Sequence, residues 1–392
     1  MSTAKIQSLL ASLRELTQQP PEDDKLRTQL SEALSSAQVA VERPLDTVHR
    51  ISFIPLQLFM TKIAVDLKLF ETLVSQGRSM SVQELAQKTG AQDVLLGRIL
   101  RYLAAFNLVS ETGVDQFEAT PVTQTLTVPG FAAGIKHHFD IQLPAWVDLP
   151  DFLAAGKYQN PSDHKHTAFQ RVHHTDQTVF TWFTTQPGYF ADFSAWMAAQ
   201  RKGQRTWLDT FPLERLVKAA HTEAPLFVDV GGSVGHQCVA LVKRLPQLVG
   251  RVVLEDLAPV IANALLHPRV ERLAHDFWTP QPVTGASFYY LRNVLHDYPD
   301  DQCIKLLQLQ RVAMGADSVL LVDELVRPAT GAPRSFVDLD IAMMACLAAQ
   351  ERTREQFEHL FRSAGLYLEE VLPYETELGH SVMVAIPAAD SD

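Results

Sequence analysis

The sequence predicts an α/β fold in which a doubly wound, mostly parallel sheet ends in an antiparallel C-terminal strand and follows an all-α, winged-helix dimerisation domain. Three observations lead to this prediction. Short β-rich runs alternate with helical stretches from Leu226 onward, which is typical of a parallel sheet with crossover helices. Only the turn at 373–380 separates the last two runs, so these strands must pair antiparallel. A helix, turn, helix and hairpin pattern occupies residues 81–117.

The composition is that of a globular chain and limits the classes of partner. The chain has 392 residues, 46% hydrophobic and 20% charged, which fits two domains and excludes global disorder. The longest apolar run, 341–349, is far shorter than the roughly 20 residues of a membrane span, and no secretion signal is visible, so no membrane partner is expected. The net charge of -11 disfavours nucleic acid. Three widely spaced cysteines favour a reducing, cytoplasmic location.

The N-terminal region is predicted to be helical. Before the break at Pro20 and Pro21, apolar residues recur with a helical period at Ile6, Leu9, Leu10 and Leu13. A helical hairpin of this kind cannot bury its own apolar stripe, so the stripe must dock on a second subunit or on the rest of the chain. Helical spacing continues over 55–73, which predicts one buried helix there.

The pattern at residues 81–117 predicts a winged-helix unit. Ser81 and Glu84 form a capping box at the start of one helix, a second helix covers 94–106, and a short hairpin follows to Phe117. Reading DNA would require basic residues along the second helix, which carries only Arg98 and Arg101. Dimerisation is therefore the favoured use of this unit.

The segment 129–205 is rich in aromatic residues and histidines, which are suited to an aromatic ligand pocket or to an ordinary helical core. The doublets His137-His138 and His173-His174 lack the i, i+4 spacing of two ligands on one helix face, so no metal site is expected. The predicted domains are residues 1–125, helical and winged-helix; 126–205, a helical connecting segment that contributes to the substrate pocket; and 206–392, a Rossmann-like catalytic domain.

A glycine-rich turn, Asp229 to His236 (DVGGSVGH), joins the first predicted strand of the sheet to a helix. Glycines let the backbone approach a ligand closely, and the helix N-terminus offers free N–H groups to a carboxylate or phosphate. The next strand ends in Glu255 and Asp256, where an acid can accept hydrogen bonds from ribose hydroxyls. Together these features indicate a nucleoside-bearing cofactor, and nicotinamide, flavin and S-adenosylmethionine all remain compatible with them.

Further sequence blocks follow in a specific order. They are DVGGSVGH at 229–236, LEDL at 254–257, HDF at 275–277, YLRNVLHDY at 290–298, VDE at 322–324, and ERT at 351–353 before Phe357. From about Pro55 to the C-terminus the chain resembles the plant-type and fungal small-molecule O-methyltransferases that depend on S-adenosylmethionine. The resemblance implies this cofactor and a class I methyltransferase fold for the catalytic domain.

Position by position, the resemblance implies a cofactor site in the catalytic domain. Gly231, Gly232 and Gly235 shape the turn, and Ser233 stands where many relatives have a third consecutive glycine. Either acid of the Glu255-Asp256 pair could face the ribose, and the family register favours Glu255. The adenine would lie beside Asp276 and Phe277, and Arg292 would complete the polar shell. A surface ion pair is the alternative interpretation of Asp276 and Arg292.

The same resemblance places a general base at His296, with carboxylates at Glu324 and Glu351 to orient its second ring nitrogen. A phenol of pKa about 10 becomes a good nucleophile only as its proton leaves, and histidine has a pKa suited to accepting that proton. Outside this block, His296 would be interpreted as a helix cap or surface residue. The residues expected to shape the acceptor pocket are His137, Phe139, Trp146, Phe183, Met343 and Met344.

The sequence therefore predicts a homodimeric S-adenosylmethionine-dependent O-methyltransferase that acts on a phenolic or enolic hydroxyl of an aromatic or polyketide-type molecule. A second hypothesis is a methyltransferase-like pericyclase or dehydratase that keeps the cofactor bound as a fixed positive charge. Arg292 and the His137-His138 doublet would then donate hydrogen bonds to a substrate carbonyl. A third is a binding module that uses the winged helix, which the net charge disfavours.

Overall fold

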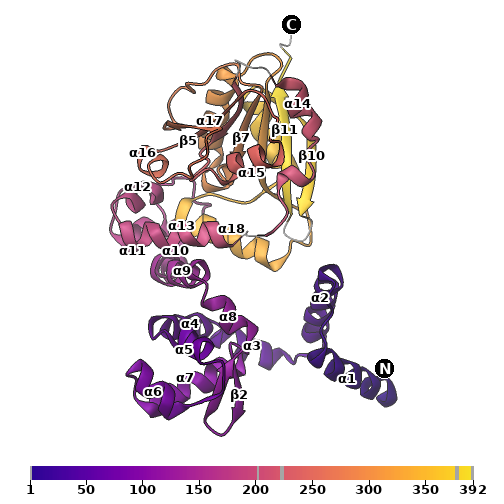
Figure 1. Ribbon diagram of the computed structural model, residues 1–392, viewed down its shortest axis with the longest axis vertical. Helices are drawn as coiled ribbons and strands as arrows, with labels where there is room; N and C mark the ends of the chain where they lie inside the picture. Colours follow the sequence, from indigo (N-terminus) through magenta and orange to yellow (C-terminus); the bar gives the residue numbers. More distant parts are fainter. Residues whose placement is uncertain (1, 201–202, 221–224, 376–378, 390–392) are drawn as a thin grey trace.

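A mixed sheet covered by helices on both faces forms the larger part of the protein (Figure 1). The computed structural model describes residues 2–200, 203–220, 225–375 and 379–389. The strands run in the order β10-β11-β8-β7-β4-β5-β6, and β9 pairs with β8 outside this row. Their bounds are β4 (Pro225–Val230), β5 (Arg251–Asp256), β6 (Val270–Ala274), β7 (Phe288–Arg292), β8 (Val319–Arg327), β9 (Arg352–Thr353), β10 (Leu366–Glu375) and β11 (His380–Pro387).

The pairing confirms the predicted fold class. Strands β4 to β8 pair parallel with one another, whereas β11 pairs antiparallel with both β8 and β10. The sequence did not predict β6 and β9. Strand β6 is an edge strand with Glu271 and Arg272 in its centre, and β9 has two residues, so neither carries the apolar run that marks an inner strand.

Alternate residues of the inner strands point to opposite faces of the sheet and pack into two separate cores. Tyr289 and Leu291 of β7 face the core under α17 (Asp300–Ala313) and α19 (Arg354–Ser363). Phe288 and Tyr290 face the opposite core, under α14 (Leu213–Ala219) and α15 (His236–Arg244). The short elements η2 (Trp207–Asp209), α16 (Ala258–Ile261) and η3 (Leu295–Asp297) complete this part.

The strand order reverses at β4, which lies between β5 and β7. In an open parallel sheet, the connections from such a strand leave toward opposite sides, and a crevice opens at the carboxyl ends of the strands. The glycine-rich turn leaves β4 at this point, and η3 leaves the neighbouring strand β7. The chain therefore brings its two most informative sequence blocks to one edge of the sheet.

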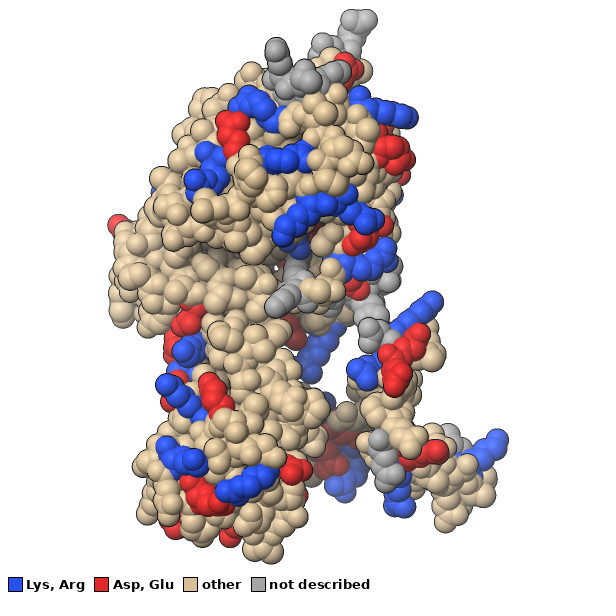
Figure 2. Space-filling view, viewed as in Figure 1, with Lys and Arg blue, Asp and Glu red and all other residues tan. Residues whose placement is uncertain are grey.

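The winged-helix unit has its own core. Its elements are α4 (Pro55–Asp66), α5 (Leu69–Gln76), β1 (Met80–Ser81), α6 (Val82–Thr89), α7 (Asp93–Ala105), β2 (Val109–Gly113), β3 (Gln116–Ala119) and α8 (Pro121–Leu126). The Ser81–Glu84 capping box is present, and β2 and β3 form the predicted hairpin. On the face shown in Figure 2, basic and acidic side chains are interspersed over this unit, and Arg101 pairs with Asp115.

The prediction of one helix over 55–73 is wrong. The chain breaks at Lys68, which adopts a left-handed conformation with φ of 51°, and α4 and α5 form separately. The turn reorients α5 so that Leu69, Phe70 and Leu73 join Ala64 of α4 in one core. A straight helix would not direct all of these side chains toward the same core.

A layer of helices lies between the winged-helix unit and the sheet (Figure 1). It comprises α9 (Pro129–His137), the π-helical segment η1 (His138–Gln142), α10 (Leu143–Ala155), α11 (Ala168–His173), α12 (Val179–Thr184), α13 (Pro187–Ala199) and α18 (Arg334–Leu347). Helix α18 packs against α10, α11 and η3, so the layer reaches the edge of the sheet that carries the glycine turn. Within the described ranges, no helix is long and apolar enough to cross a membrane.

Three N-terminal helices extend away from the rest of the molecule (Figures 1 and 2). They are α1 (Thr3–Gln18), α2 (Asp24–Val41) and α3 (Pro44–Phe53), and we call them the N-terminal arm. None of the arm residues with a described side chain is buried. Large apolar residues are exposed along it, including Leu45, Val48, Ile51 and Phe53 of α3, each at least 57% accessible. The arm therefore has an apolar surface that its own chain does not cover.

Candidate active site

The glycine turn after β4 is tightly packed against the sheet. Gly231 and Gly235 have φ of 70° and 87°, in the left-handed region that glycine adopts without strain. A Cβ at Gly232 would lie only 2.4 Å from Cγ of Asp229 and 2.6 Å from Cδ1 of Leu254. Ser233 adopts a glycine-like φ of 55°. The turn therefore keeps its shape although serine replaces the third glycine.

The two acids at the end of β5 lie in different environments. Glu255 is 1% exposed, and its Oε2 accepts a hydrogen bond from Gln281 and lies 3.0 Å from Nδ1 of His275. Asp256 is half-buried, and its Oδ2 accepts a 2.8 Å hydrogen bond from the N–H of Ser233 in the turn. Burial raises the pKa of both carboxyl groups. Asp256, rather than Glu255, lies directly beside the turn.

Phe277 and Asp276 lie beside this region. A Cβ at Gly231 would be 3.2 Å from the ring of Phe277, so this ring covers the start of the turn. The Phe277 ring also packs edge-on against Tyr298, at 6.1 Å between centroids. Asp276 is exposed, and its Oδ1 accepts a hydrogen bond from the N–H of Trp278. The aromatic ring and the carboxylate thus both lie near the start of the glycine turn.

Arg292, at the end of β7, belongs to a buried polar network. Its Nε lies 3.2 Å from Oδ2 of Asp323, which is completely buried in the neighbouring strand β8. The hydroxyl groups of Tyr290 and Tyr374 donate to the same carboxylate at 2.5 and 2.8 Å. The Arg292 side chain retains 20% exposure. This charge is therefore fixed at the end of β7 by a buried carboxylate and does not form a surface ion pair.

His296 lies in η3, directly after β7, with 14% of its side chain exposed. Its Nδ1 is 2.8 Å from Oε1 of Glu351, and its Nε2 is 3.5 Å from Oδ1 of Asp297. Glu351 is buried and comes just before β9. The histidine is therefore oriented through one ring nitrogen and presents the other beside a carboxylate.

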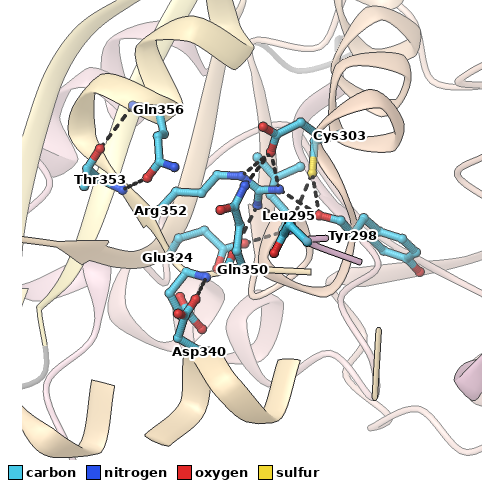
Figure 3. Close-up of polar contacts among 12 residues, drawn as sticks. Leu295, Tyr298, Cys303, Glu324, Asp340, Gln350, Arg352, Thr353 and Gln356 are labelled. Atoms are coloured by element: carbon cyan, nitrogen blue, oxygen red, sulfur yellow. Dashed lines mark hydrogen bonds and ion pairs between the residues drawn. The ribbon is translucent and has the colours of Figure 1, made fainter. Parts of the chain in front are cut away.

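Glu324 contacts the backbone of the same segment. The N–H groups of Val294 and Leu295 donate to Oε1 of Glu324 at 2.9 and 2.8 Å (Figure 3). Glu324 is completely buried in β8. Burial raises the pKa of Glu324 to about 7, an effect that the positive charge of His296 opposes. Glu324 thus holds the segment that carries His296.

The charges around His296 determine its protonation state. Burial disfavours the imidazolium, but the negative charges of Asp297, Glu351 and Glu324 outweigh this effect and raise the pKa of His296 to about 10. The same burial raises the pKa of Asp297 to about 6 against the opposing charge of His296. The site is thus built to stabilise a protonated imidazole, which is the form a general base reaches when it has taken a proton.

The residues expected in an acceptor pocket do not all lie together. Phe183 and Met343 are buried in one cluster, which Trp146 packs against, and the His137 ring lies 6.1 Å from that of Phe183. Met344 is half-buried on the same helix as Met343. Phe139 instead packs edge-on against Phe59 of α4 and lines an open groove of about 520 Å³.

His137 is a neutral polar group within this aromatic region. It is 5% exposed, and burial, with repulsion from His138, lowers the pKa of His137 to about 3. Its Nδ1 makes no hydrogen bond. The Phe193 ring lies 5.5 Å from His137, and Phe180 connects Phe193 to Tyr298 near His296. The ring of His137 therefore belongs to the aromatic layer beside the candidate site.

Several residues that build the site were not predicted from the sequence. Asp297, Asp323 and Arg352 each lie within a sequence block that resembles the family, directly beside a residue that was assigned a role. Their positions could therefore have been found. Their roles depend on side chains that the fold brings from other strands, such as Tyr374 onto Asp323.

Comparisons with known proteins identify the family of this chain. Residues 146–367 match the model of the O-methyltransferase domain, and residues 58–129 match the O-methyltransferase dimerisation domain. The chain is 39% identical to O-methyltransferase lepI of Aspergillus flavus over 98% of both chains. It is 37% identical to the demethylsterigmatocystin 6-O-methyltransferase of the same species, over 93% of this chain and 94% of the relative.

Solved structures show the same fold. The structure of LepI in complex with SAM matches with a TM-score of 0.90 and 38% identity, over 98% of this chain and 100% of that one. A structure described as a pericyclic reaction enzyme matches over the same shares with a TM-score of 0.90 and 37% identity. Sheet order, site geometry and these matches lead to one conclusion: the chain belongs to the O-methyltransferase family.

Proposed function

We propose that this enzyme transfers a methyl group from S-adenosylmethionine to a hydroxyl of an aromatic or polyketide-type secondary metabolite, with His296 as the general base. The observation that carries the proposal is the 2.8 Å contact between Nδ1 of His296 and Glu351, at the sheet edge where the glycine turn leaves β4. That contact fixes the ring and leaves Nε2 as the atom that accepts a proton.

The residues around the turn fit the proposed cofactor. The turn lies so close to Asp229 and Leu254 that a Cβ at Gly232 would collide with both, as expected of a backbone that must approach a ligand. Gly231, Gly232 and Gly235 would hold the cofactor against the turn. The side chains that would contact it are Asp256 at the ribose, Asp276 and Phe277 at the adenine, and Arg292 at the polar end. When bound, the cofactor supplies a methyl group activated by a sulfonium.

Asp256 is a better ribose ligand than Glu255. Glu255 is buried, and its Oε2 contacts Gln281 and His275 within the domain, whereas Asp256 lies at the turn and is partly accessible. Both oxygens of Asp256 accept from the backbone, Oδ2 from the N–H of Ser233 and Oδ1 from the N–H of Leu257. These bonds hold the carboxylate at the turn, and each oxygen keeps a lone pair for a hydroxyl.

His296 and its neighbours would move one proton. Glu351 accepts the hydrogen on Nδ1, so the acceptor hydroxyl gives its proton to Nε2 as the oxygen forms its bond to the methyl carbon. The bound cofactor would supply the methyl carbon, and its sulfur would keep the electron pair of the bond that the methyl group leaves. The surrounding carboxylates stabilise the imidazolium that results. Holding the hydroxyl in line with the methyl group contributes as much as the base does.

The function can be tested with labelled S-adenosylmethionine and a panel of phenols and polyketide-type hydroxyl compounds. Methyl transfer predicts a labelled product heavier than the acceptor by one methylene. Label that stays on the cofactor with every acceptor of the panel would count against methyl transfer as the reaction.

We expect kcat/KM to rise with pH into the alkaline range, because the free enzyme must first lose the proton from His296, whose pKa is raised to about 10. Replacing Asp297 by asparagine removes an adjacent negative charge, so the pKa of His296 should fall and the midpoint of the profile should move to lower pH. The profile is measured by initial rates in buffers of constant ionic strength. Asp301→Asn, which removes an exposed carboxylate of α17, serves as the control. Identical profiles for Asp297→Asn and Asp301→Asn would argue against the assigned base.

A second candidate function is a rearrangement or dehydration with the cofactor retained. It is favoured by the match to a protein described as a pericyclic reaction enzyme and by the neutral, unpartnered Nδ1 of His137 in the aromatic layer. Arg292 is less suited to bind a substrate carbonyl, because Asp323 holds it in the sheet. A product isomeric with its substrate, formed without loss of cofactor, would support this candidate.

We propose that the enzyme is a homodimer and that the N-terminal arm docks on the second copy. The arm leads directly into the segment that matches the dimerisation domain, and its apolar residues have no cover in their own chain. Replacing Ile51 by glutamate should therefore convert the dimer to monomer, as measured by sedimentation at micromolar protein. Val312→Glu, on the exposed face of α17 in the sheet domain, is the matched control and should stay dimeric.

A further inference from the structure

Arg352 makes an unusual set of contacts next to the candidate base. Its side chain is completely buried, yet each nitrogen of its guanidinium donates a hydrogen bond (Figure 3). Nη1 donates to the carbonyl of Leu295 at 2.7 Å, and Nη2 donates to the carbonyl of Tyr298 at 2.8 Å. Nε and Nη2 also donate to Oδ1 of Asp300. The two carbonyls lie on either side of the pair His296-Asp297.

The backbone at Arg352 is itself fixed. Arg352 pairs with Val326 in the short parallel contact of β9 with β8. The next residue, Thr353, caps α19 through a reciprocal capping box with Gln356, drawn in Figure 3. Strand pairing on one side and a helix cap on the other leave the origin of the guanidinium little freedom.

Two consecutive residues, Glu351 and Arg352, therefore hold η3 in different ways. Glu351 binds the ring of His296 through Nδ1, and Arg352 binds the backbone carbonyls that flank His296. Glu324 of β8 in turn accepts from the backbone N–H groups at the start of the segment. The donors and acceptors of this segment are thus satisfied by side chains from different strands.

We propose that Arg352 is a positioning residue for the base. It holds the backbone on both sides of His296, so that the imidazole keeps its hydrogen bond with Glu351. The inference rests on the proposed role of His296, but the contact between its ring and Glu351 can be measured without any reaction. A guanidinium suits this task because its planar fork reaches two carbonyls and a carboxylate at once, which a single ammonium cannot do with the same geometry.

The burial of Arg352 argues against a purely stabilising role. Removing a charge from water costs several kcal/mol, which an ion pair repays only with excellent geometry. Its counter-ion Asp300 is itself 47% exposed, so the pair is asymmetric. A buried hydrophobic side chain would fill the same space without that cost, but it would leave the two carbonyls without these donors.

The pKa of His296 shows whether its ring keeps its place beside Glu351, because the surrounding carboxylates stabilise the imidazolium. They are Asp297 of η3 itself, Glu324 of β8, and Glu351 just before β9. Beyond them, α18 provides Asp340, which accepts from the N–H of Glu351, and α17 provides Asp300. Movement of the ring away from Glu351 would lower its pKa.

The test is an NMR titration of the His296 ring in the full-length protein, assigned with the His296→Ala variant and run without substrate. In Arg352→Lys, which keeps the positive charge, we expect the pKa of His296 to fall by about 1 unit or more. In turnover, kcat should fall while the KM values for cofactor and acceptor stay nearly constant. Arg354→Met, an exposed arginine two residues along, should leave the pKa unchanged.

A second pair of variants keeps the test decisive if Arg352→Lys does not fold. Asp300 is half-exposed, and Asp300→Asn weakens its contact with the guanidinium of Arg352. Asp301→Asn removes the same charge one residue further on, at a position that does not contact Arg352. A larger fall in the pKa for Asp300→Asn than for Asp301→Asn supports positioning. Equal shifts in this pair, or an unchanged pKa in folded Arg352→Lys, would overturn it. Failure of methyl transfer in the wild type would contradict the proposed function alone.

Discussion

Replacing His296 by alanine should lower the rate of methyl transfer by about 10²–10⁴-fold, the usual contribution of a positioned general base. The variant removes the imidazole whose Nδ1 lies 2.8 Å from Glu351 and whose Nε2 lies 3.5 Å from Asp297. Residual transfer should increase with pH as the acceptor hydroxyl itself ionises, near the phenol pKa of about 10. Single-turnover measurement with labelled cofactor separates this chemical step from product release.

The first control for this variant is its affinity for the cofactor. Titration calorimetry should show unchanged affinity for S-adenosylmethionine, because no contact of His296 involves the glycine turn. The matched substitution is His166→Ala, which removes an exposed imidazole paired with Asp163 and should leave the rate unchanged. A His296→Ala protein that transfers methyl at the wild-type rate would eliminate His296 as the base.

Replacing Gly232 by alanine should weaken S-adenosylmethionine binding by about 10–100-fold. The added Cβ would lie 2.4 Å from Cγ of Asp229 and 2.6 Å from Cδ1 of Leu254, and both neighbours are buried. Relieving such an overlap costs about 1–3 kcal/mol and moves the turn away from its ligand-bound shape. Calorimetry measures the affinity, and thermal unfolding should show a lower midpoint.

Gly188→Ala is the control for this steric effect. Gly188 lies in α13, and an added Cβ would meet nothing within 4 Å. Affinity and thermal stability should therefore stay close to those of the wild type. If Gly232→Ala binds the cofactor with native affinity, the close approach of the backbone is not needed and the proposed cofactor position is wrong.

The sheet was predictable because its inner strands are buried on both faces. Runs such as 226–230 and 287–291 are almost wholly apolar, and they correspond to β4 and β7 at the centre of the sheet. The short turn between the last two strands fixed their antiparallel pairing. Strand β6 escaped prediction because an edge strand can carry charges such as Glu271 and Arg272.

The candidate site was predictable as far as the resemblance extends along the chain. His296 and Glu351 lie 55 residues apart in sequence, yet the structure brings them to 2.8 Å. Which of two adjacent acids faces the turn was not predictable, because Glu255 is held inward by Gln281 from a distant loop. The same holds for Phe139, whose ring turns toward Phe59 of α4 and away from the cluster around Met343.

The three cysteines, all buried, give the protein a built-in reporter of local opening. Burial raises the pKa of Cys303 and of Cys346 to about 12, so their thiols are protonated and resist alkylation while the fold is closed. Cys303 donates to the same carbonyls of Leu295 and Tyr298 that Arg352 holds. Detachment of the η3 segment would expose this sulfur, so the rate at which a thiol reagent labels Cys303 would report how often the segment opens.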